Sequence, residues 1–185
     1  NWLSWVDISY GFDVYLPEGG RLAFEFPQGQ TQASSYFNNS RLTQDFTQGN
    51  LSGFTLDLPD GQQYKYSMVW WPHRYYMTQR TDARGVVVNF NYAEVEDQYQ
   101  NFGLRLVSLT DDAAQTLFTL QYAESNVLFG HLVTSVTTRG TTAYIDYVND
   151  YSPHVSLVED GAGIQSALLY DWYGRVGFPT NLTTP

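Results

Sequence analysis

Phe54–Leu58, which reads Phe-Thr-Leu-Asp-Leu, is the stretch that decides the fold, because apolar and polar side chains take turns along it. The same alternation occurs in residues 86–92 and 118–122. A period of two places one set of side chains on one face of a β-sheet and the other set on the opposite face. Gly, Pro, Asn and Asp interrupt these runs, and such residues favour turns. The sequence therefore predicts an all-β protein.

The spacing of these runs predicts about ten strands at intervals of about a dozen residues, which is typical of a two-sheet antiparallel β-sandwich of jelly-roll type. Chains of this length often form a sandwich without dividing, so we expect residues 1–185 to form a single domain. The expected strands are Arg21–Phe26, Leu51–Leu58, Gln63–Trp71, Gly85–Glu94, Asn101–Leu109, Thr116–Ala123, Val127–Thr138, Thr142–Val148, Pro153–Val158 and Gln165–Tyr173.

Three segments depart from this pattern. Gln30–Gln48 is polar and irregular, and we interpret it as a surface loop or as a short edge strand around Tyr36–Phe37. Asp111–Gln115 is expected to form a short helical turn with an Asp as its N-cap. The aromatic residues 1–16 could dock on a neighbouring subunit by strand exchange, since exposed sheet edges accept added strands.

Composition excludes several classes of partner. The net charge is −10 and the chain has one Lys and eight Arg, which argues against nucleic acid and anionic membrane surfaces. There is no run of 18 apolar residues, so we expect no membrane-spanning helix. An eight-stranded membrane barrel would fit the length, but residues 178–185 make a poor closing strand. The chain has no Cys, which excludes disulfides, thiolate metal sites and a Cys nucleophile.

Two weak signals favour an extracellular protein or one at a cell or virion surface. The chain begins with Asn1 rather than Met, which suggests processing of a precursor. N-glycosylation sequons begin at Asn38, Asn50 and Asn181, although a chain rich in Ser and Thr contains one or two by chance.

Residues 70–84 carry the densest local chemistry, with three Arg and one His among several aromatic residues. Exposed Trp or Tyr beside Arg can stack on a sugar ring or anchor a protein interface. The plainer interpretation is that one Trp belongs to the core and the Arg residues solvate a loop. The residues predicted to bind a ligand or partner are Trp70, Trp71, His73, Arg74, Tyr75, Tyr76, Arg80 and Arg84.

Acidic residues cluster elsewhere, with one group at Glu94, Glu96 and Asp97 and a second between Asp146 and Asp160. Separate basic and acidic surfaces suit head-to-tail contacts between identical subunits. Glu94 and Glu96 lie two apart and would share a strand face, a spacing that is compatible with an acid–base pair for sugar cleavage. Solvated carboxylates at a strand end are the simpler interpretation.

No cofactor or metal site is predicted. His73, His131 and His154 have no ligand spacing for zinc and no Gly-x-Ser-x-Gly elbow accompanies them. Ca²⁺ is the one metal to consider, because aspartates stand in predicted turns. The aspartates concerned are Asp111, Asp112, Asp146, Asp150 and Asp160.

These observations favour a non-catalytic structural subunit, extracellular or from a virion, that acts by self-association or docking in a larger assembly. A carbohydrate-binding module or lectin is the second interpretation, with Trp71, Tyr75 or Tyr76 lining a shallow groove. A jelly-roll glycosidase or polysaccharide lyase is the third, and it needs a carboxylate with a raised pKa in a deep cleft. A lipocalin-like barrel with a hollow interior is the fourth.

Overall fold

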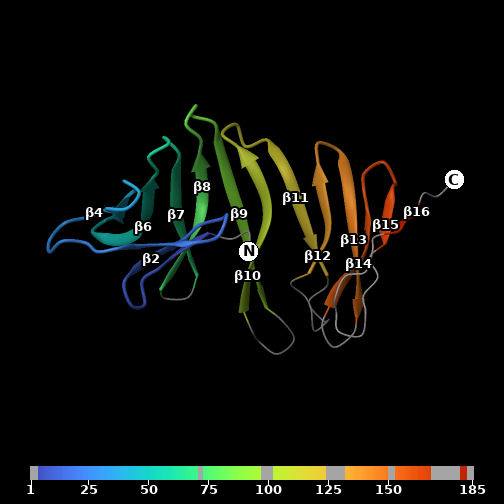
Figure 1. Ribbon diagram of the computed structural model, residues 1–185, viewed down its shortest axis with the longest axis horizontal. Coiled ribbons are helices and arrows are strands. Elements are labelled where there is room, and N and C mark those ends of the chain that lie inside the picture. The colour runs from blue at the N-terminus through green and yellow to red at the C-terminus, as the bar shows by residue number, and fades with distance from the viewer. Residues whose placement is uncertain are drawn as a thin grey trace. The chain divides into compact units, whose positions relative to one another are not determined.

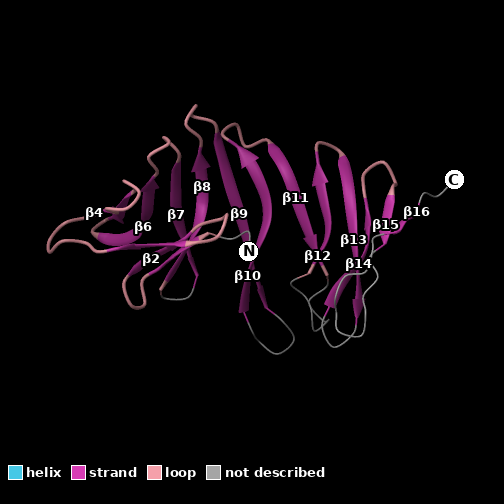
Figure 2. Ribbon diagram, in the orientation of Figure 1, coloured by secondary structure: helices cyan, strands magenta, loops and turns pink. Residues whose placement is uncertain are grey.

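The structure of the chain is a computed structural model, which describes residues 4–70, 73–96, 102–123, 132–149, 153–167 and 180–182. The regular elements of this part of the chain are sixteen β-strands, and it contains no α-helix (Figure 2). In these same ranges, no helix has the length and apolar character needed to cross a membrane. The all-β prediction is therefore confirmed.

The chain divides into two compact units. The first comprises Asn1–Phe90 and Thr110–Gln115, and the second comprises Asn91–Leu109 and Thr116–Pro185. The first unit holds β1 (Trp5–Asp7), β2 (Phe12–Tyr15), β3 (Arg21–Phe24), β4 (Gln32–Ser34), β5 (Arg41–Thr47), β6 (Asn50–Asp57), β7 (Gln63–Trp70) and β8 (Arg74–Thr81). Both units share β9 (Val87–Glu96) and β10 (Phe102–Asp111). The second unit holds β11 (Thr116–Tyr122), β12 (Val133–Thr138), β13 (Thr141–Asn149), β14 (Pro153–Glu159), β15 (Gln165–Ala167) and β16 (Thr180–Leu182).

In the first unit, β4 to β8 form an antiparallel ladder in which consecutive strands are neighbours. Leu42 lies opposite Leu56, and Leu56 lies opposite Tyr64. Residues opposite one another share a face of the sheet, so these three side chains form one row. All three are buried. The alternation read from Phe54–Leu58 therefore identifies the core face of β6, since Phe54 and Leu56 are both buried.

The first three strands form a second layer over this ladder. β1 pairs with β8 on one side and with β2 on the other, and β2 pairs with β3. The N-terminal strands therefore turn back over the ladder from β8, whose last residues pair with β9, and Figure 1 shows them in blue, crossing the teal strands of the ladder.

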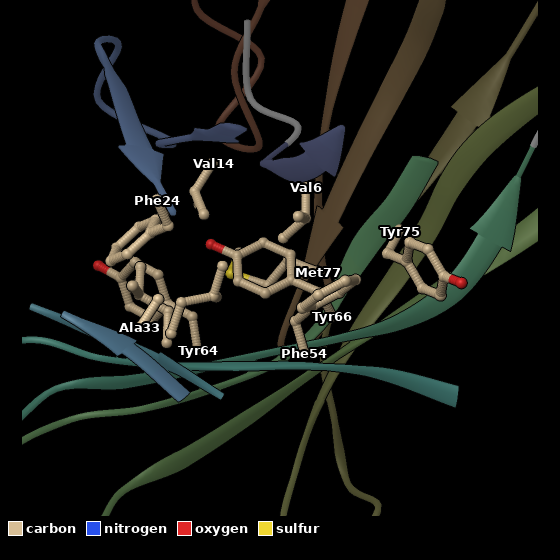
Figure 3. Close-up of a cluster of buried hydrophobic side chains, with 11 residues drawn as sticks. Val6, Val14, Phe24, Ala33, Phe54, Tyr64, Tyr66, Tyr75 and Met77 are labelled. Atoms are coloured by element: carbon tan, nitrogen blue, oxygen red, sulfur yellow. The ribbon is translucent and has the colours of Figure 1, made fainter. Parts of the chain in front are cut away.

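The hydrophobic core lies between these two layers (Figure 3). Val6, Val14 and Phe24 project from the layer of β1–β3. The ladder contributes Ala33, Leu42, Phe54, Leu56, Tyr64, Tyr66, Tyr75 and Met77. Full burial of a side chain of the size of Val, Leu or Phe contributes about 1.5–3 kcal/mol. One buried polar pair ties the layers together, because the Ser4 hydroxyl lies 3.0 Å from the Tyr66 hydroxyl and donates to the Tyr15 carbonyl at 2.6 Å.

Strands β6 and β7 approach one another closely at Gly53. A Cβ atom at this position would overlap the carbonyl oxygen of Tyr66 and would lie 3.3 Å from Cα of Ser67. Both neighbours are backbone atoms, which no rotamer change can move. The sequence therefore needs glycine at this point of the ladder.

In the second unit, β11 to β16 form an antiparallel ladder with consecutive strands as neighbours, drawn from yellow to red in Figure 1. Leu120 lies opposite Val136, and Val136 lies opposite Ala143, so one face of these strands is apolar. Among the side chains of this unit that the structure describes, Leu106 and Ser135 are buried and the others are half-buried or exposed. The dense core of the described chain thus belongs to the first unit.

Three hairpins share one turn geometry that begins at an aspartate. In each, the Asp carboxylate accepts a hydrogen bond from the backbone N–H four residues later. These aspartates are Asp82, Asp111 and Asp160, in the β8–β9, β10–β11 and β14–β15 connections. The third residue after each has a positive φ: Gly85 84°, Ala114 61° and Gly163 81°. The helical turn predicted at Asp111–Gln115 is therefore wrong, and its aspartate caps a hairpin turn instead.

The finer predictions of the fold differ from the structure. Sixteen strands replace the expected ten, partly because Gln30–Gln48 contains β4 and β5. Tyr36 and Phe37 lie on the turn between those strands rather than in an edge strand. The described ladders follow chain order, whereas a jelly roll interleaves strands by Greek-key connections. Two facing layers occur within the first unit, but the β1–β8 pairing joins them. The single-domain prediction stays a prediction.

Candidate functional site

The outer face of β1–β3, which points away from the core, carries a mixed aromatic and charged surface. Trp5 lies opposite Tyr15 on β2, and opposite Tyr76 on β8. The Trp5 and Tyr15 rings stack at 4.6 Å between centroids with 17° between planes. The Trp5 and Tyr76 centroids are 6.1 Å apart. Alternation explains the arrangement, since Val6, Val14 and Tyr75 take the inward positions between these residues.

A row of charges runs beside the aromatic row. Asp7 lies opposite Asp13 on one side and opposite Arg74 on the other. Like charges placed opposite one another destabilise a sheet. Here each carboxylate has an arginine, because Arg74 Nε lies 3.2 Å from Asp7 and Arg21 Nε lies 3.3 Å from Asp13. The Arg74 guanidinium also lies 6.0 Å from the centre of the Trp5 ring.

Two open hollows border these rows, and together we call them the outer groove. The first, of about 610 Å³, is lined by Asp7, Ser9, Tyr10, Asp13, Arg21 and Arg74, among others. The second, of about 400 Å³, is lined by Ser9, Trp70, His73, Arg74 and Tyr76. Ser9 and Arg74 belong to both linings, so the hollows adjoin at these residues. Tyr10 is fully exposed at the first hollow.

A β-bulge brings Trp70 to the groove. Tyr66 lies opposite Met77 and both are buried, but the register shifts between Tyr66 and Met68. Beyond the shift, Trp70 lies opposite Arg74, on the same face as the groove. Bulges commonly redirect a side chain in this way.

Asp7 and Arg74, the ion pair between the two hollows, are both held in their charged forms. Burial alone would raise the pKa of Asp7, but hydrogen bonds from Ser9 and Arg74 outweigh it and hold the pKa below its usual value. The Ser9 backbone N–H donates to this carboxylate at 2.9 Å. The hydrogen bond to Asp7 in turn raises the pKa of Arg74, although burial opposes this effect. Both groups are therefore charged at neutral pH, and this pair is suited to donating and accepting hydrogen bonds rather than to transferring protons.

Four of the eight predicted site residues lie at the outer groove. Trp70, His73, Arg74 and Tyr76 come together at the second hollow. Tyr75, at 6% exposure, belongs to the core, where its ring packs edge-to-face against Phe54 at 5.0 Å. Trp71 lies outside the described residues.

Arg80 and Arg84 line neither hollow of the outer groove. Arg80 donates two hydrogen bonds to Gln62 Oε1, at 3.1 and 2.7 Å, and its guanidinium lies 5.6 Å from the centre of the Tyr64 ring. Arg84 pairs with Asp82 in the β8–β9 turn at 3.1 Å. Six residues along an extended strand span about 20 Å, so Arg80 is distant from Arg74.

The described residues do not assemble the alternative catalytic and metal sites. Glu94 is exposed on β9, while the side chain of Glu96 and all of Asp97 lie outside what is described, as do His131 and Asp150. In the described part of the chain, no three His, Cys, Asp or Glu residues gather as a metal site. Asp111 and Asp160 bind backbone N–H groups of their own turns.

Sequence reasoning missed the part of the groove that β1–β3 supply. Asp7, Asp13 and Arg21 are scattered single charges in the sequence, and their meeting depends on strand pairing. The sequence signal for this part of the groove was alternation. Trp5 and Asp7 flank the apolar Val6, and Asp13 and Tyr15 flank the apolar Val14. This alternation would have placed each aromatic and each carboxylate on a common face, without identifying the partner strand.

Comparisons with known proteins add little. No family model matches the chain, and no curated protein matches it significantly. Among solved structures, a porin-like protein from Bacteroides uniformis is similar over 96% of this chain and 92% of that chain, with 10% sequence identity and a TM-score of 0.33.

Proposed function

We propose that the protein is a non-catalytic binding protein and that its outer groove takes carbohydrate. The supporting observation is the combination, on one open face, of aromatic rings with two Asp–Arg pairs. Aromatic rings pack against the C–H faces of sugars, and charged groups fixed by ion pairs offer oriented donors and acceptors to hydroxyl groups. Binding sites commonly combine an apolar lining with a few such polar groups.

The proposal is non-catalytic because Asp7, the central carboxylate of the groove, is not suited to act as a general acid. A glycosidase needs one carboxylic acid that stays protonated through a raised pKa. The hydrogen bonds at Asp7 act in the opposite direction and lower its pKa.

Calorimetry with a panel of oligosaccharides tests the proposal, with tryptophan fluorescence as a second readout. We expect Arg74→Ala to weaken binding about tenfold or more, because it removes a charged donor that lines both hollows. Arg41→Ala is the matched control, since Arg41 forms a similar exposed pair with Asp57, at 3.0 Å, on the ladder. The proposal is wrong if no oligosaccharide binds, or if both variants bind as the wild type does.

A second candidate function is that of an extracellular or virion structural subunit, and the turn between β4 and β5 favours it. Tyr36 and Phe37 are 98% and 101% exposed. The turn that presents them is well defined, because Ser35 N–H donates to the Ser40 carbonyl at 2.8 Å and Asn39 N–H donates to the Ser35 carbonyl at 3.1 Å. Exposed aromatic residues on a fixed backbone are suited to anchor a protein interface.

Sedimentation velocity over a range of concentrations tests this candidate. The double substitution Tyr36→Ser and Phe37→Ser should abolish any oligomer, while Val86→Ser, at another exposed turn residue, should leave it unchanged. A wild-type chain that stays monomeric at every concentration removes self-association. The docking of residues 1–16 on a neighbour stays a separate proposal, since β1 and β2 already pair within the chain.

A further inference from the structure

The charges that line the outer groove largely cancel one another. Asp7 and Asp13 are 19% and 23% exposed, and their partners Arg74 and Arg21 are 50% and 56% exposed. The arginines are therefore the more accessible members, but each already faces a carboxylate. Glu25 adds a further negative charge to the lining of the first hollow. An anionic ligand would have to compete with these carboxylates for the two guanidinium groups.

The net charge of the whole chain also disfavours anionic ligands. Its net charge of −10 repels polyanions at long range. Screening at physiological salt weakens that repulsion beyond about 8 Å, so the carboxylates in the groove decide the outcome at contact. An uncharged ligand avoids both effects, and its hydroxyl groups can still accept from Arg74 and donate to Asp7 or Asp13.

The size of the groove sets a minimum length for the ligand. Each hollow, at about 610 and 400 Å³, lies within the range of about 300–1,000 Å³ that small-ligand sites occupy. A ligand that fills one hollow can extend into the other past Ser9 and Arg74, which line both. Each hollow also has an aromatic residue, Tyr10 in the first and Trp70 in the second.

From these observations we infer that the outer groove takes an uncharged oligosaccharide of at least two sugar units, with Arg74 between the two subsites. The inference rests on the proposed function and names the class of its ligand.

The wild-type protein is tested by calorimetry against two series of oligosaccharides. One series holds neutral cello-, malto- and N-acetylchito-oligosaccharides of one to six units, and the other holds oligogalacturonates of the same lengths. We expect a marked rise in affinity from one unit to two or more for a neutral series. Galacturonates should bind at least about tenfold more weakly than the best neutral ligand, because carboxylates would face carboxylates.

Charge-neutralising variants test the reason for this selectivity. Asp7→Asn and Asp13→Asn keep the shape of the side chain and leave Arg74 or Arg21 without its opposing charge. Each should raise the affinity for oligogalacturonate about twofold to fivefold, the size expected of an exposed ion pair. Asp57→Asn is the matched control, since it releases Arg41 from a similar pair that does not line the groove, and it should change neither series.

The outcomes separate this inference from the proposed function. If galacturonates bind as tightly as neutral sugars, or if affinity does not rise beyond one unit, the inference is wrong while carbohydrate binding stands. If neither series binds, the proposed function fails and the inference fails with it. Unchanged selectivity in both groove variants would refute the argument from charge.

Discussion

Replacing Gly53 by Ala should destabilise the first unit, although the substitution adds only a methyl group. The new Cβ would overlap the carbonyl oxygen of Tyr66 and press on Ser67 Cα at 3.3 Å. Strands β6 and β7 must separate to relieve this contact, at the position where they border the core. Overpacking of this kind costs about 1–3 kcal/mol.

Gly11→Ala is the matched control, because a Cβ at Gly11 meets no atom within 4 Å. Where the backbone tolerates it, Gly→Ala stabilises by about 0.4–1 kcal/mol through the unfolded state. The unfolded-state gain is common to both substitutions, so the two variants should differ by the overpacking cost of about 1–3 kcal/mol in the free energy of unfolding. With a urea slope of about 2 kcal/mol per M, the midpoints should lie about 0.5–1.5 M apart.

Urea titration followed by tryptophan fluorescence measures this difference. Of the five Trp residues, Trp2, Trp5, Trp70 and Trp71 belong to the first unit, so the signal reports mainly on that unit. Equal midpoints for the two variants would refute the close approach of β6 and β7 at this position.

Three further predictions concern the core, the turns and pH. Phe54→Ala should cost about 3–5 kcal/mol in a urea titration, because a fully buried ring and its edge-to-face contacts with Phe12 and Tyr75 are lost. A loss below 1 kcal/mol would contradict the burial. Ala114→Gly should raise the free energy of unfolding by about 0.5–1 kcal/mol, measured by thermal denaturation, since Ala114 has φ 61° where the two equivalent turns use Gly. A lowered melting temperature would contradict that turn geometry. The lowered pKa of Asp7 stabilises the folded state above about pH 4, and this contribution is lost as the pH falls through the folded-state pKa. Asp7→Asn should therefore flatten the stability profile below pH 4, and an unchanged profile would refute the role of this pair.

Much of the strand pattern could be predicted from the sequence, because apolar and polar residues alternate along the strands that border the core. The expected strand Leu51–Leu58 differs from β6 by one residue at both ends, and the expected strand Gln63–Trp71 differs from β7 by one residue at its C-terminal end. β5 was missed because its alternation is almost wholly polar: Leu42 is buried, while Thr43 and Asp45 point to the other face. A strand with few apolar residues at its inward positions resembles a loop in sequence.

The missed β8 shows a different limit. Tyr75 and Met77 face the core while Arg74 and Tyr76 face the groove, so aromatic residues occupy both sides of the strand. The period of two is hidden when both faces use similar residue types. The groove itself depends on pairing between β1 and β8, which no local pattern encodes. Sequence analysis could therefore name four residues of the groove but not the strands that complete it.

The pairing of β1 with β8 has a consequence for synthesis of the chain. Asp7 and Arg74 are 67 positions apart, whereas β4 to β8 are joined by short hairpins. Contacts between distant positions form late because a long loop must close first. During translation, Val6, Val14 and Phe24 leave the ribosome well before the strands that cover them. A nascent chain arrested before β8 would expose these apolar side chains, so it should attract chaperones that a chain extended past β8 no longer needs.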